Sequence, residues 1–305
     1  MAKIKVALIQ PEWYKEPEYA LEETERILEE LCQEERPDFI SLPEFFTGAP
    51  WYMPGRYEYK ERVTYTVPGV ITQRLGKIAK KYSVFILCGT FVEEENGKYY
   101  NTSVLLGSDG SIAGKASKIH RYASELSNIE PGSGQLVVST PLGKIGVCVC
   151  SDFWIPEMPR MLALKGAEII CVPGNSLIQN LEVVKPVVLA NSVNNCCYTL
   201  YNSVSGMLEG VRNGKIIKIE FGGYSTISGP VNIINSLGRE TGACIGELDL
   251  DYLRELRKLD VTFSNTSFWT LLGRRPELYN GILKPYAGAD GSFEEQVRNY
   301  IGKGR

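Results

Sequence analysis

The stretch Lys144-Ile-Gly-Val-Cys-Val-Cys150-Ser-Asp-Phe-Trp-Ile-Pro156-Glu157 decides how this chain folds and where its chemistry can lie. The run up to residue 149 is rich in valine and isoleucine, which is typical of a buried strand. Ser151 or Asp152 can then cap a helix, and the Pro156-Glu157 pair suits a first helical turn and its dipole. The stretch therefore predicts a strand, a sharp turn and a helix.

Cys150 stands at that predicted turn. A thiol there would lie beside free backbone N–H groups and a partial positive charge. Both lower the pKa of a cysteine, and both can hold an oxyanion. Cys150 is therefore a candidate nucleophile that needs a base from elsewhere in the chain. The alternative is a cysteine that only packs inside a strand, which is how we interpret Cys148.

Strands and helices alternate on both sides of this stretch. Strands are expected at residues 3–10, 38–43, 84–89, 99–106, 112–118, 144–149 and 168–173. Helices are expected at 17–35, 71–82, 158–165 and 182–195. Asn96-Gly97 favours a tight hairpin, and a second hairpin is expected between 227–234 and 245–250, turning around 236–238. Alternation with hairpins predicts mixed sheets covered by helices.

Composition limits the function. The chain has 305 residues, 44% of them hydrophobic, and a net charge of −3. An acidic balance argues against nucleic acid as a partner. No apolar run reaches the roughly 18 residues that a membrane span needs, so no membrane partner is expected. One domain with a trailing C-terminal arm from about residue 262 is the best interpretation.

The cysteines and the single histidine narrow the chemistry further. None of the eight cysteines has C-x-x-C spacing, so zinc or haem attachment is unsupported. No export signal is recognisable, so we expect reduced thiols in the cytoplasm. His120 is the lone histidine, which excludes metal sites that need two. No cofactor motif is present, and we expect no cofactor and no metal.

Charged side chains stand where predicted strands end or in the following loops. Glu44 lies between a proline and two phenylalanines, so its carboxylate is partly desolvated, which suits proton transfer. Lys118 closes the strand at 112–118, and an ammonium there can stabilise a thiolate or an oxyanion. Taken alone, a solvated glutamate and a solvated lysine remain open alternatives.

The order of these residues changes the interpretation. The chain contains, in sequence, Leu42-Pro-Glu44-Phe, Lys118-Ile-His120, Gly146-Val-Cys-Val-Cys150-Ser-Asp152 and Pro156-Glu157. This set resembles the nitrilase (carbon–nitrogen hydrolase) superfamily, which carries a Glu-Lys-Cys triad in this order at comparable separations. The resemblance covers most of the chain, because Ile4–Gln10 looks like the family's first strand and Arg274–Tyr279 like a motif near its C-terminus.

The resemblance implies a role for each residue of the set. Cys150 would be the nucleophile, Glu44 the general base and Lys118 the oxyanion stabiliser. The backbone N–H of Ser151 would be a second oxyanion donor. Family members often carry a further glutamate six residues before a Pro-Gly pair, which here implies Glu125. The same pattern implies that His120 orders its loop and is not a base.

The walls of the pocket are less certain from sequence. Trp51, Tyr52, Trp154 and Asn175 could line it, although loop aromatics as often only pack. The family often has an aromatic residue after the nucleophile, and Ser151 in that place is closer to its amidase-type branches.

The resemblance also implies a fold and an activity. The fold would be a four-layer α-β-β-α sandwich with two mixed sheets. The activity would be cofactor-independent hydrolysis of a linear amide or N-carbamoyl group of a small molecule, through a cysteine thioester. A homodimer or larger homo-oligomer is expected. The alternatives are a nitrilase that acts on a nitrile, and a catalytically silent member that serves in binding or assembly.

Overall fold

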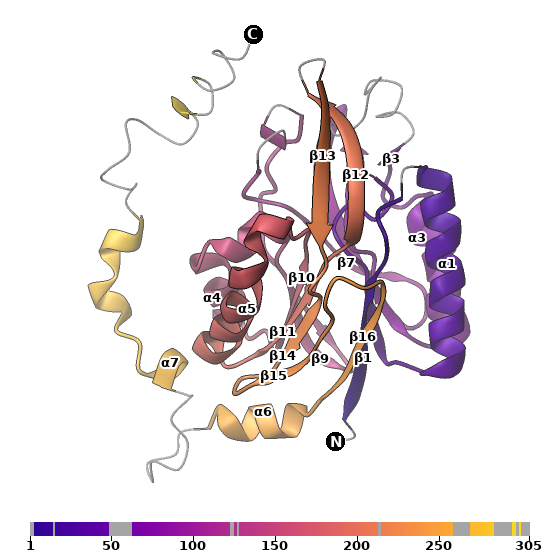
Figure 1. Ribbon diagram of the computed structural model, residues 1–305. Coiled ribbons are helices and arrows are strands. Elements are labelled where there is room, and N and C mark those ends of the chain that lie inside the picture. The colour runs from indigo at the N-terminus through magenta and orange to yellow at the C-terminus, as the bar shows by residue number, and fades with distance from the viewer. Residues whose placement is uncertain are drawn as a thin grey trace.

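Two β-sheets pack face to face, and helices cover the outer face of each (Figure 1). The computed structural model describes residues 3–14, 16–48, 63–122, 125–126, 128–212, 215–258, 269–283, 295–296 and 299. In Figure 1 helices α1 and α3 lie on one side of the sheets and α4 and α5 on the other. The predicted four-layer α-β-β-α sandwich is confirmed.

The first sheet contains eight of the described strands, in the order β16-β1-β2-β4-β6-β5-β3, with β7 also paired to β6. It is mixed, because β1, β2 and β4 run parallel while β16 and β6 run antiparallel to their neighbours. The strands are β1 (Ile4–Gln10), β2 (Phe39–Ser41), β3 (Thr64–Tyr65), β4 (Phe85–Leu87), β5 (Phe91–Glu95), β6 (Lys98–Leu106), β7 (Ile112–Ser117) and β16 (Gly242–Leu248).

The second sheet contains six of the described strands, in the order β15-β14-β11-β10-β9-β8. Its centre, β9-β10-β11, is parallel, and antiparallel strands flank it. The strands are β8 (Leu136–Thr140), β9 (Gly143–Val147), β10 (Ile169–Pro173), β11 (Tyr198–Asn202), β14 (Thr226–Ser228) and β15 (Ile233–Ser236). A separate ribbon of β12 (Ser205–Arg212) and β13 (Lys215–Gly222) extends beyond the sheets (Figure 1).

Some helices lie between the strands along the chain, and others follow the last described strand. They are α1 (Pro17–Glu34), α3 (Val70–Tyr82), α4 (Glu157–Leu164), α5 (Leu181–Asn195), α6 (Leu250–Leu256) and α7 (Trp269–Leu272). Short 3-10 helices span Cys150–Trp154, Ile178–Asn180, Pro276–Leu278 and Asn280–Leu283. Within the described residues, no helix combines the length and the apolar character that crossing a membrane requires.

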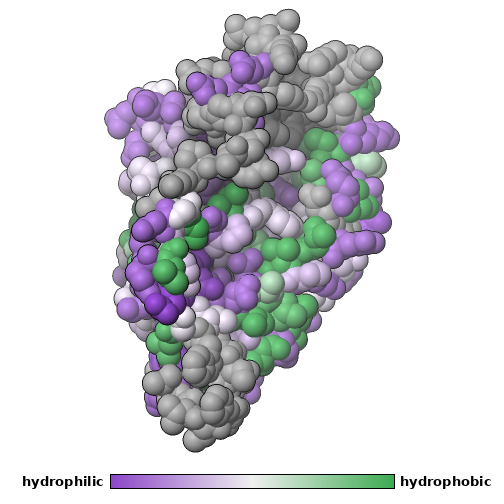
Figure 2. All heavy atoms as spheres, turned by 90° about the vertical axis from the view of Figure 1, so that its left-hand side faces the viewer, coloured by the Kyte–Doolittle hydropathy of each residue, from purple (hydrophilic) through white to green (hydrophobic). Residues whose placement is uncertain are grey.

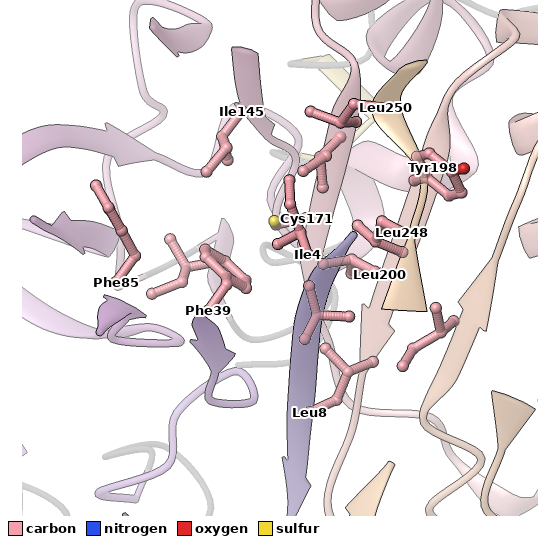
Figure 3. Packing of buried hydrophobic residues seen from close by; sticks show 14 of the residues in the cluster. Ile4, Leu8, Phe39, Phe85, Ile145, Cys171, Tyr198, Leu200, Leu248 and Leu250 are labelled. Carbon is pink, nitrogen blue, oxygen red and sulfur yellow. The ribbon is translucent and has the colours of Figure 1, made fainter. Parts of the chain in front are cut away.

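Strand alternation produces the layers. Val6 and Leu8 of β1 belong to the core between the sheets, whereas Ala7 and Ile9 pack under α1 and α3. Successive side chains of a strand point to opposite faces, so one strand supplies two layers of core. Figure 3 shows the inner layer, where Leu8 and Leu200 from the two sheets belong to one cluster. Each fully buried side chain of this kind stabilises the fold by roughly 1.5–3 kcal/mol.

One expectation about strand pairing was wrong, and one strand pair was not expected. The predicted hairpin around residues 236–238 is wrong, because β16 pairs with β1 in the other sheet rather than with β15. Seven residues of β16 are in register with β1, which gains more ladder hydrogen bonds than a local hairpin with the four-residue β15 would. The ribbon β12–β13 was not predicted at all.

The helix expected at 158–165 is confirmed within one residue as α4, but the segment that joins it to Cys150 was not expected to be helical. A 3-10 helix occupies Cys150–Trp154, and α4 begins only at Glu157. The acidic residue in the first turn of α4 is where the sequence placed it. The intervening turn leaves Cys150 at a positive φ of 44°, a conformation that side chains other than glycine rarely adopt. The chain therefore turns more sharply at Cys150 than the sequence suggested.

Candidate active site

The predicted catalytic residues come together where strands of both sheets end. Glu44 follows β2, Cys150 follows β9 and Asn175 follows β10. The loops after neighbouring parallel strands meet at one sheet edge, which is where ligands bind in open α/β sheets. These residues line a cavity of about 530 Å³ together with Lys118, Glu125 and Ser151.

The backbone fixes Glu44 from several sides. The residue is 3% exposed, and its carbonyl oxygen accepts a hydrogen bond from Asn175 Nδ2 at 3.0 Å. The next residue, Phe45, donates its N–H to Thr90 Oγ1 at 3.0 Å. Gly89 passes so close that an added Cβ would lie 2.0 Å from the carbonyl oxygen of Pro43. The loop that carries the carboxylate is therefore held rigidly against β4.

Lys118 is placed by the loop that follows β7. Its N–H donates to the Asn101 carbonyl at 2.8 Å, and its carbonyl accepts from Gly132 N–H at 2.7 Å. An added Cβ on Gly132 would lie 2.1 Å from the Ser117 carbonyl, so only glycine allows this approach. The Pro131-Gly132 pair, which served above as a sequence marker, thus packs directly against the backbone of the lysine.

The Lys118 ammonium lies between two carboxylates. Its Nζ is 2.9 Å from Glu44 Oε1 and 2.7 Å from Glu125 Oε2, and its side chain is 2% exposed. Asn101 Nδ2 donates to Oε1 of the same two glutamates, at 2.9 and 2.8 Å. Glu125 also accepts from the Tyr122 N–H at 2.7 Å. Charge-assisted contacts of this kind hold both carboxylates at fixed positions.

Burial and charge shift the protonation of this cluster. Burial by itself would lower the pKa of the Lys118 ammonium, but the carboxylates of Glu44 and Glu125 outweigh it and hold that pKa well above its usual value. Burial raises the pKa of the Glu125 carboxyl, against the opposing effect of Lys118. Lys118 therefore stays charged, and Glu125 binds a proton more readily than a solvated glutamate.

The Cys150 thiol lies close enough to the Glu44 carboxylate and to the backbone of Asn175 for both to shift its pKa. Burial raises the pKa of this thiol, the Glu44 carboxylate raises it further, and Lys118 offsets only part of the effect. The expectation of a lowered thiol pKa was therefore wrong. It counted the positive groups at the turn and could not count the burial and the neighbouring carboxylate. The resting thiol is protonated and has a carboxylate within reach to take its proton.

Neither Ser151 nor Asp152 caps α4, whose N-cap is Pro156, but the Asp152 carboxylate accepts the N–H of Val149 at 3.4 Å and so caps the short 3-10 helix. The Asp152 carboxylate is buried, accepts from the backbone N–H groups of Ile119 and His120, and lies 2.8 Å from His120 Nδ1. Ser151 Oγ donates to the His120 carbonyl. The turn after Cys150 is thus tied to the segment after Lys118, and His120 lies in that ordered segment.

Two of the four predicted pocket residues line the cavity. They are Trp154 and Asn175, whereas Trp51 and Tyr52 lie outside the described residues. The lining residues that sequence reasoning missed are Phe45, His120, Arg121, Tyr122, Ile155, Leu177, Val183 and Phe221. Phe221 belongs to the ribbon β12–β13, and the Asn213-Gly214 dipeptide was a hairpin signal that could have revealed that ribbon.

Asn101 is the most consequential omission. It lies inside β6, is fully buried and contacts both glutamates. Nothing in its local sequence distinguishes it from a polar residue on an exposed strand face. Among the described residues, no group of three or more histidine, cysteine or acidic side chains is arranged to hold a metal ion.

Together these groups can move one proton and hold one negative charge. The carboxylate of Glu44 pairs with the ammonium and lies near enough to the thiol to raise its pKa, so it is placed to accept a proton that leaves Cys150. Lys118 and the N–H groups at the start of the 3-10 helix provide positive potential beside the sulfur. The arrangement suits nucleophilic attack by sulfur on a polarised carbon.

Comparisons with known sequences identify the family. The model of the carbon-nitrogen hydrolase family matches residues 5–258. An omega-amidase of Xenopus tropicalis is 28% identical over 85% of this chain and 93% of its own. A nitrilase of Pyrococcus abyssi is 31% identical over 85% of this chain and 94% of its own.

Solved structures share the fold. A carbon-nitrogen hydrolase from Helicobacter pylori G27 superposes with a TM-score of 0.78 at 24% identity, over 93% of this chain and all of that one. An amidase from Nesterenkonia sp. gives a TM-score of 0.70 at 22% identity, over 92% and 96% of the two chains. Because the family model spans most of its length, this chain belongs to the carbon-nitrogen hydrolase family.

Proposed function

We propose that the protein hydrolyses a linear amide or N-carbamoyl group of a small molecule through a thioester on Cys150. One observation carries the proposal. Glu44, Lys118 and Cys150 line one cavity, the Glu44 carboxylate pairs with Lys118 at 2.9 Å, and both charged groups are near enough to shift the pKa of the Cys150 thiol. A base, a nucleophile and a fixed positive charge thus lie close to one another, which is what acyl transfer to a thiol requires.

The first half of the reaction forms the thioester. Glu44 takes the thiol proton as the sulfur of Cys150 attacks the carbonyl carbon, and the carbonyl oxygen becomes an oxyanion. Lys118 and the backbone N–H of Ser151 hold that charge. Loss of one such donor typically costs about 2.7–4 kcal/mol of transition-state stabilisation. The C–N bond breaks as a glutamic acid gives a proton to the leaving nitrogen, which departs as ammonia or an amine.

The second half hydrolyses the thioester. A glutamate removes a proton from water, the hydroxyl adds to the carbonyl carbon, and the sulfur of Cys150 leaves and regains a proton. The raised pKa of Glu125 suits a group that alternately holds and releases a proton. The shared contacts of Glu125 and Glu44 with Lys118 and Asn101 keep both carboxylates facing the same space.

The cavity also favours a type of acyl group. The apolar part of the lining is formed by Phe45, Trp154, Ile155, Leu177, Val183 and Phe221. Of the charged side chains that line the described part of the cavity, Lys118 is paired with carboxylates, and Arg121 donates to the Ile129 carbonyl at 3.0 Å. An acyl part with an apolar body therefore fits better than a second carboxylate.

A panel of short primary amides, N-carbamoyl compounds and the matching nitriles, assayed for ammonia, tests the proposal. We expect turnover of amides or carbamoyl compounds, abolished in Cys150→Ala and retained in Cys148→Ala, whose thiol is buried two residues earlier. Mass spectrometry of wild-type protein quenched during turnover should find an acyl group on Cys150. Equal turnover by Cys150→Ala would refute the thioester.

The two alternatives give different results in the same experiments. A nitrilase releases ammonia from nitriles in preference to amides. This alternative is kept because the Pyrococcus abyssi relative is named a nitrilase. A catalytically silent binding or assembly member would turn over nothing, and iodoacetamide would then label Cys150 no faster than the other cysteines. Preferential labelling of Cys150 favours an activated thiol.

The expected partners are the small-molecule substrate and further copies of the chain, with no nucleic acid or membrane, in the cytoplasm. Figure 2 shows the face that carries α4 and α5, where green apolar residues lie among purple ones. Met161 and Leu164 of α4 are 43% and 49% exposed there. We propose a homodimer or larger homo-oligomer, and a monomeric mass in light scattering would contradict it.

A further inference from the structure

The one histidine of the chain is anchored beside the nucleophile by a buried carboxylate. Asp152 is 2% exposed, and its Oδ1 lies 2.8 Å from His120 Nδ1 and accepts the His120 backbone N–H at 2.6 Å. Asp152 Oδ2 accepts from the N–H groups of Ile119 and Val149 at 3.2 and 3.4 Å. The steps proposed above use neither the ring of His120 nor the carboxylate of Asp152.

This environment selects one tautomer of the ring. Three backbone N–H groups donate to the carboxylate of Asp152, which presents only acceptors to its neighbours. The neutral imidazole must then carry its proton on Nδ1 to satisfy the 2.8 Å contact, which leaves a lone pair on Nε2. The side chain of His120 is 39% exposed and lines the cavity. Because Nδ1 faces the buried carboxylate, Nε2 is the ring nitrogen left to face a ligand in the cavity.

The cavity needs such an acceptor if its substrate carries N–H groups. The carboxylates of Glu44 and Glu125 already accept from Lys118 and Asn101. An amide or carbamoyl NH₂ that enters the cavity loses water and needs hydrogen-bond acceptors there. His120 is a further lining residue with an acceptor nitrogen.

We propose that His120 Nε2 accepts a hydrogen bond from the substrate's N–H, and that Asp152 is a positioning residue that fixes the tautomer and the ring. The inference rests on the proposed amide or carbamoyl hydrolysis. His120 transfers no proton in this scheme, and it accepts from the nitrogen both before and after the C–N bond breaks. A substrate without N–H groups gains nothing from this contact, which gives the site a preference between amides and esters of the same acid.

Two substitutions of His120 distinguish the role of Nδ1 from that of Nε2. His120→Asn keeps a group near the Nδ1 position, in reach of Asp152, but has no counterpart of Nε2. His120→Gln carries its amide oxygen about as far out as Nε2. The probes are a primary amide and the p-nitrophenyl ester of the same acid, which has no N–H. We expect His120→Asn to lower kcat/KM about tenfold on the amide and less than twofold on the ester, and His120→Gln to recover part of the loss. Equal losses on both substrates would mean a purely structural role and would overturn the proposal.

Asp152→Asn tests the positioning role. The new side-chain NH₂ can face Nδ1, which then becomes the acceptor and places the ring proton on Nε2, the wrong tautomer for an N–H substrate. We expect the same selective loss on the amide. The matched control is Glu168→Gln, another buried carboxylate, which pairs with Arg254 at 2.6 Å and accepts the Lys144 N–H outside this cavity. Glu168→Gln should lower the midpoint of thermal unfolding without changing the amide-to-ester ratio. A ratio altered equally by Glu168→Gln contradicts the assignment.

The design also separates this inference from the proposed function. If wild-type protein turns over no amide, the proposed function fails, yet acylation of Cys150 by the ester remains measurable. The amide is then tested as a competitive inhibitor of that acylation. A Ki raised about tenfold by His120→Asn supports the contact with Nε2, and an unchanged Ki refutes it.

Discussion

Two lysines three positions apart near the end of β7 each pair with two glutamates, but they differ greatly in burial. Lys115 lies 2.7 Å from Glu93 and 3.1 Å from Glu95. Lys118 likewise lies within 3 Å of two glutamates. The side chain of Lys115 is 31% exposed, whereas that of Lys118 is 2% exposed. An ammonium between two carboxylates is therefore not sufficient to mark an active site.

The origin of the carboxylates separates the two clusters. Both partners of Lys115 come from β5, which pairs with β6 beside β7, so the cluster is a cross-strand contact within one sheet. The partners of Lys118 come from loops 74 and 7 residues away in sequence, and a cysteine of the other sheet lies near one of them. Only the second cluster lines the cavity of about 530 Å³. Convergence of distant loops on a reactive side chain is the feature that predicts chemistry.

The largest expected difference is in catalysis. Lys118→Ala removes the oxyanion charge and leaves two buried carboxylates facing each other, so we expect kcat/KM for an amide to fall at least roughly 10²–10³-fold. Lys115→Ala should leave kcat/KM per folded enzyme within about twofold. Ammonia assays on both variants, normalised to the folded fraction from circular dichroism, give the comparison. Equal losses in the two variants would break it.

The sequence predicted the second cluster through the order and spacing of its residues, which resemble the carbon–nitrogen hydrolase family, while local sequence alone left Glu44 and Lys118 open. Glu44 and Cys150 each follow an apolar run that stops abruptly at a polar residue, and such positions come together at the edge of a sheet. That topology accounts for Glu44 and Cys150, whereas Lys118 and Glu125 were placed in the site only by what the family resemblance implied. The layers could be predicted from the strands, since strands that are apolar throughout need cover on both faces.

Asn101 and β16 could not be predicted, for a different reason. Asn101 lies in mid-strand, and its importance comes only from which loops pass over it. The partner of β16 is β1, more than 230 residues earlier, and the intervening turn favours the wrong local neighbour. The thiol pKa failed likewise, because its main cause is burial by distant segments. Local sequence reports the ends of elements better than it reports their non-local contacts.

Substitutions in the two clusters should also differ in their effect on the reactivity of the Cys150 thiol. The Glu44 carboxylate helps to raise the pKa of Cys150, so Glu44→Gln should lower that pKa and move the iodoacetamide rate profile of Cys150 to lower pH. At pH 8 we expect about tenfold faster alkylation, while amide hydrolysis falls because the base is lost. Glu93→Gln, in the Lys115 cluster, should change neither.

The sign of the linked stability effect follows from the same shift. The folded protein holds the Cys150 proton more tightly than the unfolded chain, so this contribution is complete below the ordinary thiol pKa of 9.0 and is lost as the pH rises above it. Glu44→Gln should therefore make stability between pH 8 and 10 less dependent on pH. Slower alkylation of Glu44→Gln at every pH would instead mean that Glu44 acts as the base for alkylation as well.

The smallest effect on catalysis, and the clearest on stability, is expected at the Lys115 cluster. Glu93 is 1% exposed and bonded to Lys115 and to Thr102 Oγ1 at 2.7 Å. Lys115→Met leaves this buried carboxylate without its cation, which should lower the free energy of unfolding by about 1–3 kcal/mol. The double variant Glu93→Gln/Lys115→Met removes the charge as well and should recover most of that loss, because removing both partners of a buried pair costs less than removing one. Urea unfolding of the two variants measures this, with amide turnover unchanged in both. If the double variant were less stable than Lys115→Met, the unpaired charge of Glu93 would not be the cause of the loss, and the Glu93 side chain would itself stabilise the fold.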